Sequence, residues 1–421
     1  MPTFSGSAST YWAKVDLEGR LVFPPEFAYL YGLAPGTEVR IDAETNGLRL
    51  HRSITSLARI YVEPTNLCNL ICRTCIRNAW EEPLGRMSKA TFTRIIEGAR
   101  HLEPPPTIFF GGLGEPLFHP QIVEMVAEAK QAGCRVELIT NGTLLEAPIS
   151  QNLVEAGLDL LWVSIDGANP DSYADVRIGA ALPQIIKNVE IFHTLRRTID
   201  DQKPDIGIAF VAMKRNIGEL PAVLHLATRL RASRIIISNV LPYTEELCGQ
   251  VLYSRVLDEI TYKPSPWVPS LDLPRIDTNE DTREAIHYIR RGGYNLSYNG
   301  DIVGRGVDRC PFIERGATAI AWDGSLSPCL PLMHGHDSFI DEHPRHSRRC
   351  VIGNLAEHSL NELWELPDYL SFRRRVQEFN YSPCTICGGC DLSETNEEDC
   401  YGNTFPTCGG CLWAQSVIQC P

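Results

Sequence analysis

Six short apolar segments alternate with longer amphipathic segments between residues 58 and 242. Of all the features of the sequence, this alternation places the strongest limit on the possible folds of the chain. The apolar segments span residues 59–63, 107–110, 135–140, 160–165, 206–212 and 234–238. Most are bounded by turn residues, as strands buried on both faces of a parallel sheet are. Between them, apolar residues recur at helical spacing, as in Phe92, Ile95, Ile96 and Ala99 after Ser88, a favourable N-cap. The pattern predicts an α/β fold with a parallel barrel or open parallel sheet.

Three cysteines, Cys68, Cys72 and Cys75, follow the first predicted strand with the spacing C-x3-C-x2-C. Barrel enzymes place their chemistry at the C-terminal ends of the strands, so this loop is expected at the active-site face. Three thiolates can hold three irons of a 4Fe–4S cluster and leave the fourth iron open, whereas electron-transfer clusters have protein ligands on every iron. A zinc knuckle or separate buried thiols are the alternatives.

The cysteine spacing resembles the signature of the radical S-adenosylmethionine (SAM) superfamily, whose core is a partial (β/α)6 TIM-type barrel. In that superfamily the open iron binds the amino and carboxylate groups of SAM, and the cluster reductively cleaves SAM to a 5′-deoxyadenosyl radical. The resemblance implies a radical SAM enzyme in which Cys68, Cys72 and Cys75 hold the SAM-binding 4Fe–4S cluster. The fold pattern agrees with the motif, although a fold pattern alone would not establish function.

The loop after the second predicted strand contains Leu113, Gly114 and Glu115. Glycine lets the backbone approach a ligand closely, and the carboxylate can accept from an ammonium group. In the superfamily, a Gly-Gly-Glu segment at this place holds the SAM amino group; Leu113 departs from that pattern. A glycine-rich turn without a ligand is the alternative. Asn141, in a polar turn after the third strand, is a further expected cofactor-binding residue.

The fourth predicted strand leads into Ser164 and Asp166, and Arg177 follows in the next helical segment. This order resembles the superfamily segment in which a serine and a downstream arginine bind the SAM carboxylate and ribose. Arg177 could form a bidentate pair with that carboxylate; an arginine on a helix surface is the alternative. Val211, at the fifth strand, and Leu241, after the sixth, are the expected walls of the adenine site. No catalytic acid or base is identified.

A second group of cysteines lies in the C-terminal part of the chain. Cys310, Gly324 and Cys329 form C-x13-G-x4-C, which resembles the start of a SPASM domain, a carrier of auxiliary iron–sulfur clusters. Seven more candidate ligands follow: Cys384, Cys387, Cys390, Cys400, Cys408, Cys411 and Cys420. Two fully ligated 4Fe–4S clusters need eight thiolates, so two auxiliary clusters are expected with their ligand assignment open. One or two zinc sites are the alternative, because C-x2-C pairs recur. Four histidines between 334 and 346 are interpreted as part of a solvated loop, with metal binding as the alternative.

Residues 1–55 are predicted to form a separate small β domain. Its segments 19–24 and 32–39 resemble the swapped-hairpin domain of AbrB- and MazE-type proteins. Basic and acidic residues nearly balance there, which favours docking or homodimerisation over DNA binding. The expected organisation continues with the radical SAM core at 56–242, a linker or irregular cap at 243–309, and a SPASM-like domain at 310–421.

The bulk composition limits the kinds of partner. The chain of 421 residues has a net charge of −13, which argues against a nucleic-acid backbone as its main partner. It has no run near the roughly 20 apolar residues that a membrane span needs, and residues 1–7 lack the pattern of a signal peptide. Its 15 cysteines therefore predict metal ligands in a reducing, cytoplasmic setting rather than disulfides.

The tail segments 390–400 and 406–415 resemble one group of radical SAM/SPASM maturases, the group associated with tungsten-cofactor oxidoreductases of the aldehyde:ferredoxin type. This resemblance implies a peptide or protein substrate, or a tungsten-bearing cofactor, and reduced ferredoxin or flavodoxin as electron donor. A peptide-crosslinking or sulfatase-type maturase with another target is an alternative function. A DNA-binding iron–sulfur redox sensor is an alternative from a different class.

Overall fold

The fold is built on one nine-stranded sheet in the order β10-β9-β8-β7-β6-β5-β14-β15-β18. The computed structural model describes residues 10–44, 47–199, 203–254, 270–273, 279–291, 295–298, 301–303, 308–340, 342–384 and 390–421. Six neighbouring strands pair in parallel, which confirms the predicted α/β core. They are β5 (Arg59–Val62), β6 (Thr107–Phe110), β7 (Arg135–Thr140), β8 (Leu160–Ser164), β9 (Asp205–Ala212) and β10 (Arg234–Asn239).

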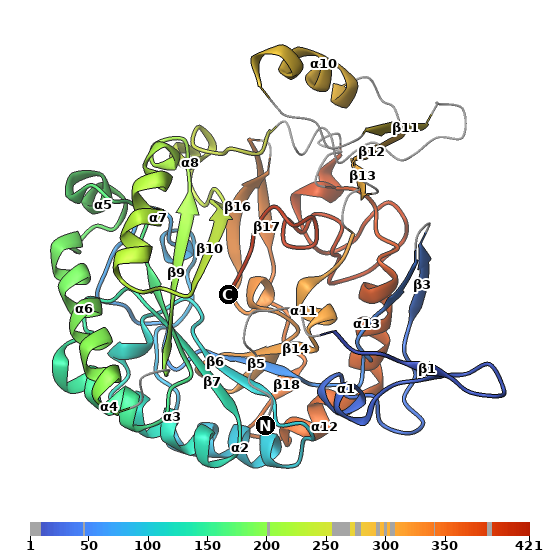
Figure 1. Ribbon diagram of the computed structural model, residues 1–421, viewed down its shortest axis with the longest axis horizontal. Helices are drawn as coiled ribbons and strands as arrows, with labels where there is room; N and C mark the ends of the chain where they lie inside the picture. Colours follow the sequence, from blue (N-terminus) through green and yellow to red (C-terminus); the bar gives the residue numbers. More distant parts are fainter. Residues whose placement is uncertain are drawn as a thin grey trace.

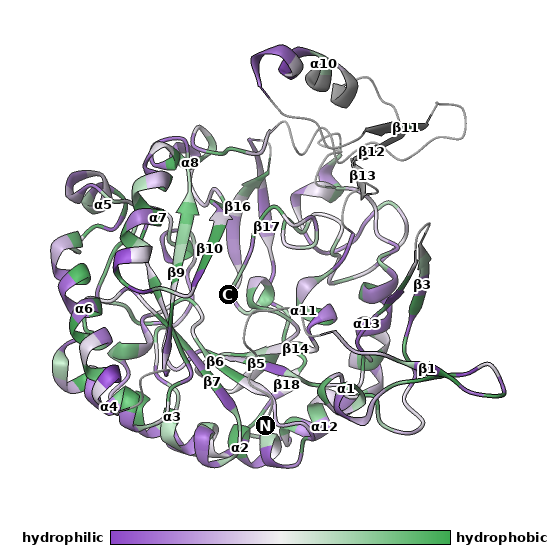
Figure 2. Cartoon of the chain, viewed as in Figure 1, coloured by the Kyte–Doolittle hydropathy of each residue, from purple (hydrophilic) through white to green (hydrophobic). Residues whose placement is uncertain are grey.

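Helices connect these strands and cover the outer face of the curved sheet (Figure 1). They are α2 (Lys89–Arg100), α3 (Ile122–Gln131), α4 (Ala147–Glu155), α5 (Pro170–Val176), α6 (Leu182–Ile199) and α7 (Leu220–Arg229). The predicted start of α2 is confirmed, because the Ser88 hydroxyl accepts a hydrogen bond from the Thr91 amide at 3.0 Å. In Figure 2 these helices carry both colours, whereas β9 is largely green, as expected for a strand buried beneath them.

The C-terminal part of the chain extends the same sheet. Strand β14 (Ala317–Ile320) pairs in parallel with β5, and β15 (Ser325–Ser327) and β18 (Gly353–Asn354) continue from it in antiparallel pairing. Ala317 and Ala319 are fully buried in a cluster with Tyr61 and Phe109. The division at residue 310 stays a prediction, but the sheet crosses it without a break. The remaining elements of this part are η4 (Leu330–Leu332), β16 (His336–Ile340), β17 (His343–Ser347), α11 (Pro311–Glu314), α12 (Leu360–Glu365), α13 (Pro367–Glu378) and η5 (Asp391–Glu394).

The N-terminal part contains two hairpins and one short helix. Strands β1 (Lys14–Val15) and β2 (Leu21–Val22) pair, as do β3 (Ile41–Glu44) and β4 (Gly47–Leu50), and α1 (Pro25–Leu30) lies between them in the chain. His51 joins this part to the rest, since its ring nitrogens lie 2.9 Å from carboxylate oxygens of Asp42 and Glu314. These elements agree with a small β unit, and the AbrB-like assignment stays a prediction. The hairpin turn expected at Asn46 lies outside the described residues.

The linker or irregular cap at 243–309 stays a prediction, but its described residues contain regular elements. They include α8 (Glu245–Cys248), β11 (Ser270–Leu273), α10 (Glu280–Arg291), β12 (Asn295–Tyr298) and β13 (Asp301–Val303). The three strands form a sheet of their own, and Figure 1 places it beside α10 at one edge of the molecule. The strands have only three or four residues each, which is too short for an alternating pattern to stand out in the sequence. In the described portion of the chain, no helix is long and apolar enough to cross a membrane.

Candidate active site

The loop after β5 brings Cys68, Cys72 and Cys75 together, as the sequence predicts. The amides of Ile71 and Arg73 donate to the carbonyls at 178 and 176, which fastens the loop to the end of α5. Cys68 and Cys72 pack against the main core, and all three thiols are only partly exposed. Burial raises the pKa of the Cys72 thiol to about 11, and the nearby Arg177 guanidinium opposes this shift. A positively charged partner beside a half-buried thiol suits a site that stabilises thiolate ligands.

The Leu113–Glu115 segment lies directly on this cysteine loop. A Cβ atom on Gly114 would come within 2.1 Å of the Thr65 carbonyl oxygen, so the close approach requires glycine. The Glu115 amide donates to the Leu67 carbonyl at 2.9 Å, one residue before the first cysteine. The two loops that sequence reasoning assigned to cluster and SAM binding are therefore packed backbone against backbone.

The Glu115 side chain is buried and hydrogen-bonded within the protein. Its oxygens accept from the Thr140 hydroxyl at 2.7 Å, the Asn141 amide at 2.7 Å and the Leu117 amide at 3.0 Å. Burial raises the pKa of this carboxyl, although these donors oppose the shift. The carboxylate thus fixes the end of β7, and its predicted contact with an ammonium group stays a prediction.

Asn141 lies between this carboxylate and the first cysteine. Its Nδ2 atom is 3.8 Å from Cys68 Sγ and 3.0 Å from Asn69 Oδ1. Its Oδ1 accepts from the amide and the hydroxyl of Thr143, which orients the carboxamide with its N–H groups toward the cysteine loop. Hydrogen bonds to ligand sulfurs are one of the means by which proteins set cluster potentials.

Asp166 and Arg177 form a buried ion pair beside Cys72. Arg177 Nε donates to Asp166 Oδ2 at 2.8 Å, and Asp166 Oδ1 accepts from the Val211 amide at 2.8 Å. Burial opposes the charged guanidinium, but the charges of Asp166 and Cys72 raise the pKa of Arg177 overall. Asp166 thus fixes the guanidinium next to the cysteine loop, where its charge interacts with the Cys72 thiol.

Tyr173 also lies in this site; it stands between Asp166 and Arg177 in the sequence, but sequence reasoning gave it no role. Its side chain is fully buried, and its hydroxyl has no hydrogen-bond partner among the described residues. Burial and the charges of Asp166 and Cys72 raise the pKa of this phenol to about 12, against the effect of Arg177. A buried polar group normally has a partner, so this hydroxyl is free to bond a polar atom of a ligand. The feature of the sequence that could have pointed to a role for Tyr173 is its position seven residues after Asp166, in the same segment.

The remaining predicted SAM contacts do not all converge. Ser164 lies half-buried at the end of β8, beside the Asp166 turn. Val211 packs in a small apolar cluster with Val176. Leu241 instead belongs to a different cluster with Leu412 and lines the pocket of C-terminal cysteines described next. The structure therefore places the two expected adenine walls in separate environments.

One pocket gathers four of the C-terminal cysteines. Cys310, Cys329, Cys408 and Cys411 all line it, and their thiols interact electrostatically with one another. Burial, together with Cys411, raises the pKa of Cys310 to about 12. Four cysteines are the number that a fully ligated 4Fe–4S cluster needs, so the donor set fits such a cluster. As the side chains stand in the described segments, no three His, Cys, Asp or Glu residues are arranged to hold a single metal ion.

The other tail cysteines divide into a neighbouring group and one further residue. Cys384 interacts electrostatically with Cys400, and both Cys390 and Cys400 are exposed. Cys387 lies outside the described residues. Cys420 accepts a hydrogen bond from Trp413 Nε1 at 3.2 Å, and Trp413 also lines the four-cysteine pocket.

Two of the four histidines expected in a solvated loop are buried instead. His334 Nε2 lies 2.8 Å from Glu63 Oε2, and both side chains are almost completely inaccessible. Glu63 directly follows β5, and its Oε1 accepts from the Leu113 amide at 3.2 Å. Burial lowers the pKa of His334, but the hydrogen bond and charge of Glu63 raise it overall. The pair connects the C-terminal part to the predicted SAM loop. The feature of the sequence that could have pointed to this pair is an acidic residue, Glu63, at the end of an apolar strand.

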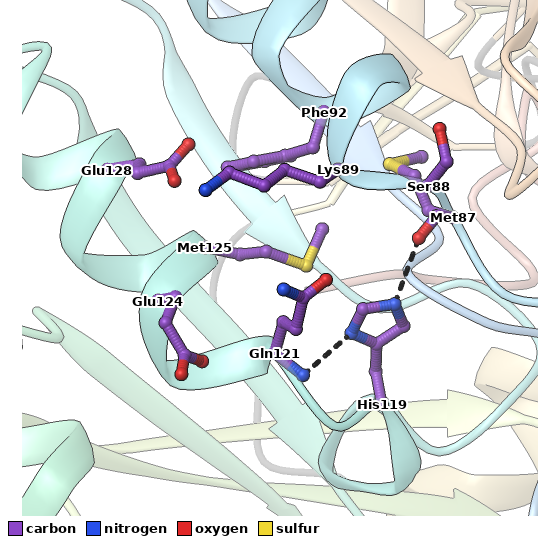
Figure 3. A pocket seen from close by; sticks show the side chains of 9 residues that line it. All are labelled: Met87, Ser88, Lys89, Phe92, His119, Gln121, Glu124, Met125 and Glu128. Atoms are coloured by element: carbon purple, nitrogen blue, oxygen red, sulfur yellow. Dashed lines mark hydrogen bonds between the residues drawn. The ribbon is translucent and has the colours of Figure 1, made fainter.

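A second pocket lies between α2 and α3, and Figure 3 shows the side chains that line it. His119 belongs to its wall: Nε2 donates to the Met87 carbonyl at 3.0 Å, and Nδ1 accepts from the Gln121 amide at 3.2 Å. Burial lowers the pKa of this imidazole, which agrees with a neutral ring that both donates and accepts. The histidine ties the loop after β6 to the start of α2.

Comparisons with known proteins agree with this geometry. Residues 62–200 match the radical SAM superfamily, and residues 310–391 match the SPASM iron–sulfur cluster-binding domain. The chain is 30% identical over 369 residues to the tungsten-containing aldehyde ferredoxin oxidoreductase cofactor-modifying protein of Pyrococcus furiosus, covering 86% of this chain and 96% of that protein. It is 29% identical over 361 residues to the PqqA peptide cyclase of Gluconobacter oxydans, covering 83% and 89%.

Among solved structures, Streptococcus suis SuiB bound to its precursor peptide SuiA matches with a TM-score of 0.50 at 15% identity, over 80% of this chain and 72% of that one. That likeness supports the fold. The superfamily implies SAM and a 4Fe–4S cluster as cofactors, and the SPASM domain implies auxiliary clusters. The thiols at 68–75, the glycine cradle at Gly114 and the unpartnered Tyr173 hydroxyl all fit a site for these groups. The chain therefore belongs to the radical SAM superfamily, as an enzyme with a SPASM domain.

Proposed function

We propose that this enzyme acts in the maturation of a tungsten-containing oxidoreductase of the aldehyde:ferredoxin type. The observation that carries the proposal is the 30% identity to the Pyrococcus furiosus cofactor-modifying protein, which extends over 96% of that protein. The match spans 86% of this chain and therefore extends well beyond the barrel. The target would be a peptide or protein segment of the oxidoreductase or its tungsten-bearing cofactor.

In this proposal Cys68, Cys72 and Cys75 hold the SAM-binding cluster. When bound, the cluster and SAM together supply a 5′-deoxyadenosyl radical, so the cofactors and not the side chains provide the radical chemistry. The protein contributes orientation. Asn141 donates toward the Cys68 sulfur, and Asp166 fixes the Arg177 guanidinium whose remaining N–H groups would bind the SAM carboxylate.

The protein also limits the access of water to the cysteine loop. Arg73 and Arg215 form a closed ring of ion pairs with Asp175 and Glu246, at N–O distances from 2.7 to 3.4 Å. The ring joins the cysteine loop, α5, the loop after β9 and α8. Exposed pairs of this kind contribute little stability one by one, but a network holds loops in fixed relation. We assign it the role of keeping the loop closed over reactive species.

For the auxiliary clusters, we assign Cys310, Cys329, Cys408 and Cys411 to one cluster. The group Cys384, Cys390 and Cys400 would contribute to the second, with Cys387 as the predicted fourth ligand. Cys420 is then the spare thiol. The support is the shared pocket of the first four and the electrostatic coupling of Cys384 with Cys400.

The first test is anaerobic. Reconstituted protein, SAM and dithionite should yield 5′-deoxyadenosine, and Cys72→Ala should abolish it. Absence of product from protein with a demonstrated reducible 4Fe–4S cluster would contradict the catalytic assignment. The second test expresses the tungsten oxidoreductase with and without this enzyme. The oxidoreductase should gain activity only with the active form, and equal activity with Cys72→Ala would contradict the maturation role.

A second candidate substrate is a peptide unrelated to tungsten enzymes. The similarity to the PqqA peptide cyclase over 83% of this chain favours it. Mass spectrometry of the co-expressed oxidoreductase distinguishes the two targets. A loss of hydrogen from the polypeptide indicates peptide modification, whereas an unchanged polypeptide with an altered pterin indicates cofactor modification.

Further partners follow from the same proposal. Reduced ferredoxin or flavodoxin would deliver the electron, in a cytoplasmic setting. The N-terminal unit exposes apolar side chains, including Trp12, which is 85% exposed, and Leu48, which is 72% exposed. This surface supports docking or homodimerisation through that unit. Light scattering of the intact protein and of Trp12→Ser tests the dimer, and a monomer in both samples would exclude it.

A further inference from the structure

Arg345, on β17, carries a buried charge that no acidic residue balances. The side chain is only 6% exposed, and in the described part of the chain no Asp or Glu forms an ion pair with it. Burying an unpaired charge is costly unless another group of opposite charge lies nearby. The position therefore requires an anionic neighbour.

The neighbours of Arg345 are cysteines. Its side chain lines the same pocket as Cys408 and Cys411, and both thiols interact electrostatically with it. A Cβ atom on Gly410 would come within 2.6 Å of the guanidinium carbon, so the chain passes directly over this group. A side chain at position 410 would have to displace the guanidinium, so glycine lets the loop between the two cysteines approach it this closely.

Arg345 also faces the other group of tail cysteines. The Cys384 thiol also interacts electrostatically with the guanidinium. Its Nη1 donates a short hydrogen bond to the Ser393 carbonyl, three residues after Cys390. The arginine thus contacts segments of both cysteine groups, 310/329/408/411 and 384/390/400.

We propose that Arg345 is a shared counter-charge for the two auxiliary clusters and raises the reduction potential of both. The proposal rests on the ligand groups assigned above. A thiolate-ligated cluster is anionic and gains one more negative charge on reduction, so a buried cation nearby favours the reduced form. Low dielectric strengthens the effect, since few water molecules screen it.

A raised potential would suit clusters that accept an electron from a substrate-derived radical. In that step the radical transfers one electron to an oxidised auxiliary cluster and releases a proton to solvent water, which leaves a closed-shell product. Arg345 is a positioning residue here, because it acts on the cluster and not on the substrate.

The test uses full-length protein whose three cluster-loop cysteines are replaced by alanine, so that only auxiliary clusters remain. Arg345→Met, Arg345→Lys and the control Arg348→Met are reconstituted and titrated with electron paramagnetic resonance detection. Arg348 lies three residues away, is half-exposed, and pairs with Glu397. It is therefore a control for the loss of an arginine in the same region whose charge is neither buried nor unpaired. Iron and sulfide content is measured in every sample.

Both auxiliary couples should move to lower potential in Arg345→Met, stay near the parent values in Arg345→Lys, and not move in Arg348→Met. Unchanged potentials in Arg345→Met, or a shift of only one couple, would overturn the shared role. If Arg345→Met loses auxiliary iron, retention of that iron in Arg345→Lys would support the proposed role of the positive charge. Loss of auxiliary iron in both variants would overturn that role. These measurements of potential and iron content need neither SAM cleavage nor a tungsten enzyme. A result that refutes the role of Arg345 can therefore be told apart from a result that refutes the proposed function.

Discussion

The buried pair Glu63–His334 gives the sharpest stability prediction. The side chains are 0% and 1% exposed, and the two atoms are 2.8 Å apart, so water screens their interaction little. Replacing His334 with leucine leaves the Glu63 carboxylate buried with two weaker donors, the amides of Leu113 at 3.2 Å and Trp322 at 3.5 Å. Breaking one side of a buried ion pair typically costs about 3–5 kcal/mol, and that is the expected loss in the free energy of unfolding for His334→Leu.

A second substitution separates the charge from the packing. Glu63→Gln keeps an oxygen that can accept from the Leu113 amide. It also removes the carboxylate charge that His334→Leu would leave buried without a partner. The double variant should therefore lose only about 1–3 kcal/mol, the range for a buried hydrogen-bonding group that has lost a partner. The two substitutions should be strongly non-additive, as expected for residues in direct contact.

The pH dependence has a definite sign. Because the folded state raises the pKa of His334, its protonated form contributes stability that is fully present below the unfolded value of about 6.5. That contribution is lost as the pH rises through the folded pKa. The penalty of His334→Leu should therefore be largest near pH 6 and shrink under alkaline conditions.

Urea unfolding of the anaerobic apo-protein, followed by tryptophan fluorescence, measures these changes. Trp80 lies edge-on to the His334 ring at 4.7 Å and reports on the site. A loss below about 1 kcal/mol for His334→Leu, or a double variant that equals the sum of the two single variants, would refute the buried-charge reasoning.

Three further predictions concern single side chains. Gly114→Ala should prevent assembly of the SAM-binding cluster, because the new methyl group would meet a backbone carbonyl at 2.1 Å; a full iron complement would contradict this. Asp166→Asn should weaken SAM binding by about 10- to 100-fold, since Arg177 loses a charge-assisted hydrogen bond, and calorimetry with unchanged affinity would exclude that role. His119→Gln should flatten the acid side of the stability profile. Burial lowers the pKa of His119, so the parent protein loses stability as the pH falls below about 6.5 through the folded pKa. Melting temperatures at pH 5.5 and 7.5 that fall equally in both proteins would contradict it.

The barrel was predictable because buried parallel strands appear in the sequence as uninterrupted apolar runs. The predicted segments 107–110 and 135–140 coincide with β6 and β7, and the other four core strands differ from their predictions by one residue at one end. The cysteines at 68–75 were equally predictable, because all three lie on one short loop. Local sequence spacing was sufficient in both cases.

Contacts between distant segments could not be predicted in the same way. Glu63 and His334 are separated by 271 positions, and neither residue type is distinctive on its own. The pairing of β14 with β5 and the convergence of Cys310 with Cys411 likewise depend on how the C-terminal part folds back onto the barrel. A cysteine count could give the number of auxiliary clusters but not the grouping of their ligands.

Arg177 and Arg345 are both buried and interact with cysteine thiols, and their other partners distinguish their roles. Arg177 has a carboxylate, Asp166, at 2.8 Å, so its charge is largely balanced and its orientation is fixed. A fixed guanidinium with a balanced charge can direct its remaining N–H groups at a ligand carboxylate, but it changes the local potential little. Arg345 donates only to a backbone carbonyl among the described residues, so its charge acts on whatever anion lies closest. The same side chain is thus expected to give geometric selectivity at the cluster that binds SAM and electrostatic control at the clusters that receive electrons.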